Sequence, residues 1–304
     1  MNRVMRIGTR DSALALWQAN TLQERLSELG ITAELVPIKS QGDLNLDQPL
    51  YAMGITGIFT KTLDIALLNK DIDIAIHSMK DVPTQLPKGI VQAAVLERGP
   101  VGDIMVWKNN MAKAKETKTI ATGSLRRKAQ WMAGNPQDKI VPLRGNIQTR
   151  LKKLQEENWD GAIFAEAALH RLNIKDEIVE PLNHLLPAPA QGALMVVCRL
   201  ENEDIAQQLT LLNDHEAEIC TQVERDFLST LEGGCTAPIG AYAYCEKDTV
   251  HFKGGLYSLE RSSSQEIKKS FPKKEADKMG AILAKALLQQ GGDILMKEFK
   301  KGHA

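Results

Sequence analysis

The chain has 304 residues, 43% of them hydrophobic and 25% charged, which is usual for a globular protein of two or three domains. Its 38 basic and 38 acidic residues leave no net charge, so no global field favours nucleic acid or a membrane surface. The sequence has no C-x-x-C spacing, no signal sequence and no run of 18 apolar residues, so we expect no disulfide framework, metal site or membrane anchor. We therefore expect a cytoplasmic protein with reduced thiols.

The first 190 residues alternate between strand-like and helix-like segments. Before a break at 99–102, strands are predicted at 4–8, 31–39, 73–77 and 90–96, and helices at 12–29 and 58–68. After the break, strands are predicted at 118–122, 140–143 and 161–165, and helices at 124–133, 147–157 and 167–172. This alternation predicts α/β units on parallel or mixed sheets.

A second break, at 185–192, contains two prolines and precedes the apolar run Ala193–Cys198. This run predicts a strand buried on both faces, which we expect to return to the first domain's sheet. Helices at 205–213 and 215–231, strands at 241–244 and 250–256, and an amphipathic helix over 276–287 complete the chain. The predicted domains are 1–97 with 193–213 (discontinuous), 100–190, and a smaller α+β domain at 216–304.

Polar and basic residues gather where predicted strands end and helices begin. Ser12 and Ser124 stand at or near N-cap positions in two segments that weakly echo each other, 6–14 and 119–127. Helix N-termini favour anions, whereas Arg126 and Arg127 in a first turn oppose the helix dipole unless an anion binds there. The alternative is that both arginines are solvated surface residues.

Further basic residues follow the same pattern. Arg144 ends a predicted strand and Arg150 lies one turn into the next helix, so both can reach the carboxyl edge of the sheet. We expect them to share one cleft with Arg10, Arg126 and Arg127. Because neighbouring guanidiniums repel each other, this cluster predicts a polyanionic ligand.

The segment His77–Pro83 also follows a predicted buried strand. In it Lys80 can pair with an anion, and Asp81 can act as a proton donor or as counter-ion to a developing cation. His77 stays ambiguous, because a histidine that closes an apolar strand is more often a hydrogen-bonded structural residue.

Cys235 lies in the sequence Gly233-Gly234-Cys235, with Pro238 three residues later. The glycines and the proline predict a tight loop that a ligand can approach closely. A single cysteine is often a small buried hydrophobe, but this context favours a thiol held for chemistry.

Four motifs in chain order are His77–Pro83 (HSMKDVP), Ser124–Arg127 (SLRR), Leu143–Asn146 (LRGN) and Leu231–Cys235 (LEGGC). Together they resemble the porphobilinogen deaminase family, also called the hydroxymethylbilane synthases, over residues 6–292. The resemblance implies two periplasmic-binding-protein-like α/β domains with a third, smaller α+β domain. It also implies a transferase that joins four porphobilinogen units head to tail, releases four ammonia molecules, and hydrolyses off the linear tetrapyrrole hydroxymethylbilane.

The roles of individual residues are likewise implied by the resemblance. Dipyrromethane would be held by a thioether bond to Cys235, and Asp81 would contact pyrrole N–H groups and stabilise the azafulvene cation left by deamination. The residues implied to bind the cofactor are Cys235, Lys80, Ser124, Arg126, Arg127, Arg144 and Arg150. Those implied to bind substrate are Arg10, Ser12, Arg144, Arg150 and Arg171.

The chain departs from the commonest family pattern at four positions, which are Thr56 (usually Lys), Gly123 (usually Ser or Thr), Ala190 (usually Gly) and Val197 (usually Glu). None of them is a catalytic match. The Gly- and Pro-containing segment 41–57 is predicted to be a lid that closes over the cleft as pyrroles add, the alternative being a passive surface loop.

Two other classes of protein remain as alternatives. One is a two-lobed binding protein without catalytic activity, which would have no need of Gly-Gly-Cys235. The other is a cysteine hydrolase, which would need a histidine motif near the cysteine that the six scattered histidines do not supply. The remaining expectations are a monomer with no metal and no nucleic-acid or membrane partner. Its product would pass to uroporphyrinogen-III synthase.

Overall fold

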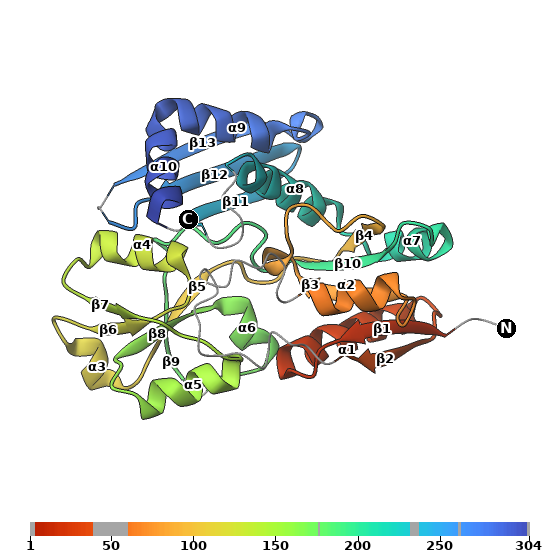
Figure 1. The fold of residues 1–304 in the computed structure, drawn as a ribbon, viewed down its shortest axis with the longest axis horizontal. Coiled ribbons are helices and arrows are strands. Elements are labelled where there is room, and N and C mark those ends of the chain that lie inside the picture. The colour runs from red at the N-terminus through yellow and green to blue at the C-terminus, as the bar shows by residue number, and fades with distance from the viewer. Residues whose placement is uncertain (1–3, 39–59, 176, 232–236, 261–262, 303–304) are drawn as a thin grey trace.

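Two five-stranded sheets with the same strand arrangement dominate the computed structural model, which describes residues 4–38, 60–175, 177–231, 237–260 and 263–302 (Figure 1). The first sheet has the order β2 (Ala33–Pro37), β1 (Met5–Thr9), β3 (Ile74–Ser78), β10 (Leu194–Arg199), β4 (Ile90–Val95). The second has the order β7 (Lys139–Val141), β6 (Thr119–Ala121), β8 (Gly161–Ala165), β5 (Asp103–Trp107), β9 (Ile178–Pro181). In each sheet three neighbouring strands are parallel, and the fourth, β10 or β5, is antiparallel to both of its neighbours. The predicted mixed α/β sheets are therefore confirmed.

The chain passes between these two sheets twice, after β4 and again after β9. The second passage leads into β10, which pairs with β3 and β4 and whose six residues are all buried. The prediction that the apolar run Ala193–Cys198 joins the first sheet is thus confirmed, although the exact domain boundaries stay a prediction. The passages form a two-stranded connection between a first lobe, built on the first sheet, and a second lobe, built on the second.

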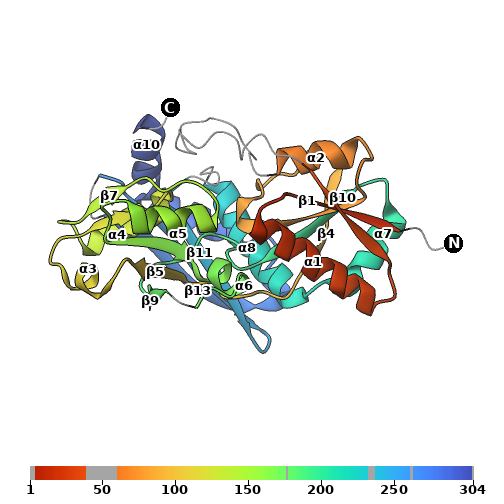
Figure 2. The same ribbon diagram turned by 90° about the horizontal axis from the view of Figure 1, so that it is seen from below.

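Helices cover both faces of each sheet. Those of the first lobe are α1 (Ala13–Glu28), α2 (Lys61–Leu68) and α7 (Glu203–Leu209). Those of the second lobe are α3 (Asn110–Ala114), α4 (Leu125–Gly134), α5 (Ile147–Glu156) and α6 (Glu166–Arg171). Figure 2 shows α1 and α2 on opposite sides of the first sheet, where each helix packs into a separate hydrophobic cluster. Because both faces are covered, the central strands β3, β5, β8 and β10 are buried over almost their whole length rather than at alternate residues.

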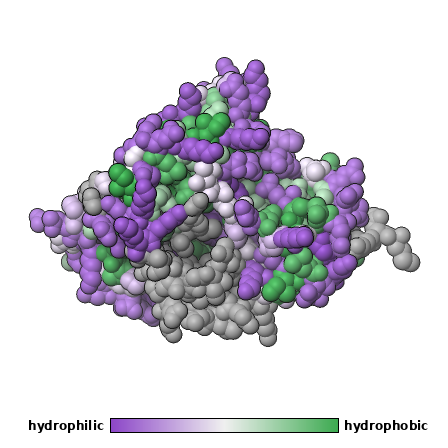
Figure 3. Space-filling view, turned by 45° about the horizontal axis from the view of Figure 1, so that its top comes forward, coloured by the Kyte–Doolittle hydropathy of each residue, from purple (hydrophilic) through white to green (hydrophobic). Residues whose placement is uncertain are grey.

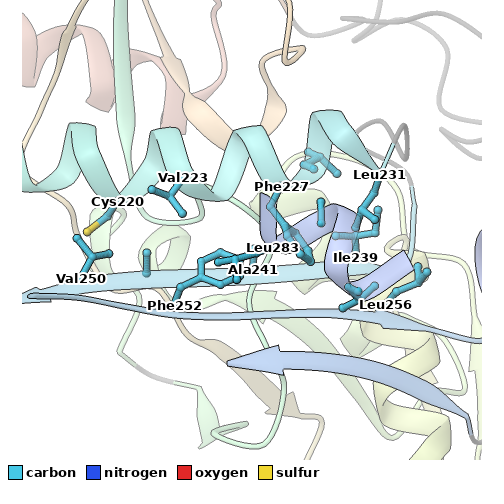
Figure 4. Close-up of a cluster of buried hydrophobic side chains, with 14 of the residues drawn as sticks. Cys220, Val223, Phe227, Leu231, Ile239, Ala241, Val250, Phe252, Leu256 and Leu283 are labelled. Carbon is cyan, nitrogen blue, oxygen red and sulfur yellow. The ribbon is translucent and has the colours of Figure 1, made fainter. Parts of the chain in front are cut away.

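A third unit packs helices on one antiparallel sheet. Its strands are β11 (Ile239–Glu246), β12 (Thr249–Tyr257) and β13 (Ser264–Pro272), and its helices are α8 (His215–Thr230), α9 (Met279–Leu287) and α10 (Asp293–Gly302). In its core, shown in Figure 4, Val223 and Phe227 of α8 lie against Ala241 of β11 and Phe252 of β12. The predicted α+β unit is therefore present at this end of the chain.

In the part of the chain that the structure describes, three strands and two α-helices were not predicted, namely β5, β9, β13, α3 and α10. Strand β13 is an edge strand whose Lys268 and Lys269 are exposed, and such charged edges have little of the hydrophobic pattern of a strand. Strand β5 begins with the charged Asp103 and is only five residues long. At Gly291, which has a φ of +103°, the chain bends and then continues as α10, so the glycine is a kink rather than an end.

The described surface is mostly hydrophilic on the face shown in Figure 3. Most of the exposed large hydrophobic side chains among the described residues lie far apart in the sequence, for example Leu29, Met111, Leu211 and Ile282. Two pairs share an element, Ile65 with Leu68 in α2 and Ile178 with Val179 in β9. Among the described residues, no helix combines the length and the apolar character needed to cross a membrane.

A buried carboxylate joins the third unit to the connection between the lobes. Glu224 of α8 is fully buried and accepts hydrogen bonds from both terminal nitrogens of Arg98, at 2.7 and 2.9 Å. The backbone N–H groups of Ala190, at 2.6 Å, and Ala243, at 2.7 Å, also donate to it. Since Arg98 and Ala190 belong to the two passages between the lobes, Glu224 ties both passages to the third unit.

Removing the charge of Glu224 should destabilise the protein severely. Glu224→Gln leaves Arg98 buried without its counter-ion, and breaking a buried ion pair costs about 3–5 kcal/mol of unfolding free energy. Urea unfolding of the variant measures this loss. Asp293→Asn is the control, because it breaks an exposed pair with Lys297 and should leave the unfolding midpoint unchanged. Equal midpoints for the Glu224 variant and the wild type would show that the junction does not depend on this charge.

Candidate active site

A cavity of about 530 Å³ lies between the two lobes. It is lined by residues that follow the carboxyl ends of β1 and β3 in the first lobe and of β6, β7 and β8 in the second, and by the second passage between the lobes. Every predicted site residue that the structure describes lines this cavity, and these are Arg10, Ser12, Lys80, Asp81, Ser124, Arg126, Arg127, Arg144, Arg150 and Arg171. The predicted convergence at the sheet edges is therefore confirmed. Cys235 falls among residues 232–236, and the predicted lid among residues 39–59, both outside the described residues.

Helix N-termini contribute to the wall of the cavity. Ser12 caps α1 and Ser124 caps α4, each accepting a hydrogen bond at 3.4 Å from the backbone N–H three residues later. Asn146 caps α5 in the same way, at 2.8 Å. All three caps line the cavity, so the positive ends of three helix dipoles face it. The two serine caps were predicted from the sequence, and their equivalent positions in the two sheets explain the weak internal echo.

Arg126 and Arg127 are buried and are held by one carboxylate, that of Asp103 at the start of β5. Arg126 Nη1 donates to Asp103 Oδ2 at 2.6 Å, and Arg127 donates to Oδ1 through Nε at 3.0 Å and through Nη2 at 2.8 Å. Burial raises the pKa of Asp103, but the two guanidinium charges outweigh it and hold that pKa well below its usual range. The alternative of solvated surface arginines is therefore wrong.

Sequence reasoning missed Asp103 altogether. Its signal was a charged residue that opens an apolar run, Asp103–Trp107, directly after the break at 99–102. A carboxylate that begins a buried strand needs cationic partners, which the structure shows to be Arg126 and Arg127.

Gln191 bridges the two lobes at the cavity floor. Its Nε2 donates to Asp103 Oδ1 at 2.9 Å and to the carbonyl oxygen of Val101 at 2.8 Å, and its Oε1 accepts from Lys80 Nζ at 3.3 Å. Burial lowers the pKa of Lys80 to about 8. The ammonium of Lys80 is thus held in the cavity by a neutral amide, and a ligand carboxylate would raise the pKa of Lys80 again.

Three further arginines reach the cavity with incomplete hydrogen bonding or depressed pKa values. Arg144 is buried, and its Nη1 has no hydrogen-bond partner among the described residues. Arg150 Nε donates to the carbonyl oxygen of Gly145 at 2.7 Å, and Arg171 Nη2 donates to that of Gly192 at 2.6 Å. Burial lowers the pKa of both Arg150 and Arg171 to about 10. These shifts show that both guanidiniums are buried with too little opposite charge nearby to offset the cost of burial.

Asp81 is the carboxylate placed among these cations. It lies in a 3₁₀ turn, Met79–Asp81, that directly follows β3. Burial lowers the pKa values of Lys80 in the first lobe and of Arg127, Arg150 and Arg171 in the second, and the negative charge of Asp81 partly offsets this lowering at all four. Among the residues that the structure describes, seven lysines and arginines line the cavity but only two carboxylates do, Asp11 and Asp81. Asp81 is thus the acid that both lobes surround.

The departures from the usual family pattern have structural correlates at three positions. A Cβ at Gly123 would lie 2.5 Å from the carbonyl oxygen of Leu143, so the loops after β6 and β7 meet too closely for a side chain there. Ala190 has a φ of +60°, a conformation that favours glycine. Val197 is fully buried in the hydrophobic cluster on the α2 side of the first sheet. Thr56 lies outside the described residues.

A cavity with this lining suits a ligand that carries several carboxylates and also N–H groups. The unpaired guanidinium nitrogens and three helix N-termini offer donors to carboxylates, and forked guanidiniums bind them strongly. Asp81 offers an acceptor to N–H groups and a charge that stabilises a cation.

Solved structures similar to this chain include extracellular binding proteins. The probable amino-acid ABC transporter extracellular-binding protein ytmK from Bacillus subtilis is 12% identical, with a TM-score of 0.42, over 70% of this chain and 90% of that one. An ancestral cationic amino acid solute binding protein is 15% identical, with a TM-score of 0.43, over 69% of this chain and 87% of that one. The description of the fold therefore rests on the strand orders and registers given above.

Sequence comparisons cover nearly the whole chain. Residues 5–207 match the model of the porphobilinogen deaminase dipyromethane cofactor binding domain, and residues 218–289 match that of the porphobilinogen deaminase C-terminal domain. The porphobilinogen deaminase of Chlorobium phaeobacteroides is 38% identical over 312 residues, which cover 99% of each chain. That of Carboxydothermus hydrogenoformans is 39% identical over 307 residues, again covering 99% of each chain. The chain therefore belongs to the porphobilinogen deaminase family.

Proposed function

We propose that the cavity between the lobes is where this enzyme, a hydroxymethylbilane synthase of tetrapyrrole biosynthesis, joins its porphobilinogen units. The observation that carries the assignment is the lining of seven cations and two carboxylates. Each porphobilinogen brings two carboxylates, so a growing chain supplies the polyanion that this lining lacks. Loss of ammonia from each unit leaves a cation, for which Asp81 is the matching charge.

The cofactor of the family, dipyrromethane, fits the residues present. Two buried guanidinium nitrogens at the cavity, Arg126 Nε and Arg144 Nη1, have no partner among the described residues and could bind its carboxylates. We assign its binding to Lys80, Ser124, Arg126, Arg127, Arg144 and Arg150, with Cys235 as the covalent anchor. When bound, it supplies the pyrrole carbon to which the first porphobilinogen is joined.

The protein's own groups act mainly by position and charge. Arg126 and Arg127 are fixed by Asp103 before any ligand arrives, so binding a carboxylate requires little reorganisation of either side chain. Arg10, Ser12, Arg144, Arg150 and Arg171 are assigned to the carboxylates of incoming units. Asp81 would accept hydrogen bonds from pyrrole N–H groups and stabilise the positive charge that develops as ammonia leaves.

The wider setting of the enzyme is proposed on the same basis. The absence of a C-x-x-C or disulfide-framework spacing in the sequence favours a cytoplasmic protein, which we take to act as a monomer. Its product, a reactive linear tetrapyrrole, would pass to uroporphyrinogen-III synthase. Size-exclusion chromatography with light scattering tests the monomer, and a mass other than about one chain would contradict it.

Cys235→Ser is expected to fold but to carry no cofactor, because a serine oxygen is a poorer nucleophile here. Intact mass spectrometry should find two pyrrole units on the wild-type chain and none on the variant. Cys245→Ser is the control and should keep the adduct, since Cys245 lies on β11, away from the cavity lining. An unmodified but active wild-type protein would contradict both the anchor and the cofactor assignment.

Asp81→Asn keeps the shape of the side chain but removes the charge that opposes the developing cation. Turnover with the cofactor in place should fall by about 100-fold or more. Asp11→Asn, at the other carboxylate of the cavity, should reduce turnover much less. Near-normal turnover of the Asp81 variant would place the charge-stabilising role elsewhere.

Asp103→Asn should release the two arginines, lowering the unfolding free energy by about 3–5 kcal/mol and preventing cofactor assembly. The matched control is Asp138→Asn, since buried Asp138 also accepts hydrogen bonds, from Lys118 N at 2.8 Å and Trp131 Nε1 at 3.0 Å, but lies off the cavity. It should lose stability but keep the cofactor, as read by intact mass.

The stability of Asp103→Asn should also depend on pH in a different way from that of the wild type. Because the pKa of Asp103 is depressed in the folded protein, its contribution to stability is present above its unfolded value of 3.8 and is lost as the pH falls further. Unfolding midpoints measured from pH 5 to pH 2 should therefore fall less steeply for Asp103→Asn than for the wild type. Parallel curves would show that Asp103 does not carry this pH dependence.

A further inference from the structure

His77 is a buried polar side chain at the cavity for which the mechanism above has no use. It is 6% exposed, lies next to the end of β3, and lines the cavity close to Lys80 and Asp81. Its Nε2 atom is buried and has no hydrogen-bond partner among the described residues. Among the described residues, no hydrogen bond of this atom supports the interpretation of His77 as a hydrogen-bonded structural residue. A buried polar atom without a partner costs free energy, which is recovered if a ligand supplies the partner.

The fold holds His77 in this place. Strand β3 lies between β1 and β10, and His77 pairs with Met195 of β10. On either side, Ile76 is buried, and Ser78 Oγ accepts a hydrogen bond from Gln18 Nε2 at 2.7 Å. A leucine or valine would meet the packing needs of such a strand, so packing alone gives no reason for an imidazole.

Burial, helped by the charge of Arg10, keeps the ring of His77 neutral. Burial, and secondly the nearby charge of Arg10, lower its pKa to about 4. The other charged groups beside it in the chain are Lys80 and Asp81, in the turn that follows β3. A neutral imidazole adds no further positive charge to a cavity already rich in cations. It does add an uncharged hydrogen-bond acceptor close to Asp81, in a cavity where Asp11 and Asp81 are the only carboxylates among the described lining residues.

We propose that Nε2 of His77 accepts a hydrogen bond from an N–H group of the incoming porphobilinogen. The donor is the aminomethyl ammonium or the ring N–H, and this contact orients the unit against Asp81. The inference rests on the proposed function of the cavity. It gives this chain a substrate-binding residue that is not itself charged.

The first test compares His77→Leu with His77→Gln. Leucine fills the space without an acceptor, so kcat/KM for porphobilinogen should fall at least about tenfold, whereas glutamine should recover much of the loss. The melting temperature of His77→Leu should equal or exceed that of the wild type, because a buried unpaired nitrogen has been removed. His215→Leu is the control at a histidine that is 84% exposed, and it should change neither quantity. A melting temperature well below that of the wild type, with kcat/KM unchanged, would make His77 a structural residue and overturn the proposal.

The second test observes the nitrogen directly. The Asp81→Asn variant is labelled with ¹⁵N-histidine, because its slow turnover keeps the ammonium of the bound unit in place. Its Nε2 resonance, assigned by its absence from the double variant with His77→Gln, should remain that of an unprotonated ring nitrogen and shift when porphobilinogen is added. A protonated Nε2 in the complex would make it a donor to a carboxylate and would overturn the proposal. A resonance that does not move would do the same.

A competitor identifies the donor on the ligand. The porphobilinogen analogue with methyl in place of aminomethyl keeps the ring N–H and both carboxylates. If its inhibition constant is equal for the wild type and His77→Leu, the ammonium is the donor, and if the constant rises in the variant, the ring N–H is the donor. Wild-type turnover and the adduct mass at Cys235 are measured first. Their absence would defeat the proposed function itself, whereas their presence with an inert His77 would defeat only this inference.

Discussion

The hydrogen bonds that Asp103 accepts from Arg126, Arg127 and Gln191 are the constraint on which the site depends. Two guanidiniums side by side at a cavity repel each other, and burial makes this repulsion stronger. One carboxylate beneath them offsets it and at the same time fixes their orientation. Because Asp103 uses up only part of their hydrogen-bonding capacity, nitrogens remain for a ligand. A site built in this way is attractive to anions yet stable before they arrive.

The same network joins parts of the protein that must act together. Gln191 contacts Lys80 of the first lobe and Asp103 of the second, and its own carbonyl oxygen accepts a hydrogen bond from Arg98 Nε at 3.0 Å. Arg98 in turn pairs with Glu224 of the third unit. A continuous chain of charge-assisted contacts therefore runs from the cavity floor to α8. If one lobe moves while the tetrapyrrole is being extended, it must either keep these contacts or replace them with others.

The sequence predicts most of the fold because its strongest signals are local. Alternating apolar strands and capped helices mark the α/β units, and the continuous apolar run at 193–198 reveals a strand covered on both faces. The convergence of the basic residues also follows from their places at strand ends. Strands β5 and β13 were not predicted in this way, because β5 begins with a charged residue and β13 carries lysines at a sheet edge. Asp103 was not predicted because its partners lie more than 20 residues away, and only the tertiary structure brings them to it. Only the structure could show that Nε2 of His77 has no hydrogen-bond partner among the described residues, because the absence of a partner cannot be read from a sequence.

The position of β10 has a consequence for how the chain folds. The first sheet lacks a strand between β3 and β4 until residues 194–199 have been made, although its other four strands lie before residue 96. During synthesis the second sheet, whose strands lie within residues 103–181, can therefore be completed while the first still has an open gap. Closing that gap pairs residues more than 100 positions apart, a type of contact that forms slowly. The lobe that holds Asp81 and His77 is thus the last of the two to acquire its final form, and the cavity between the lobes can exist only after that step.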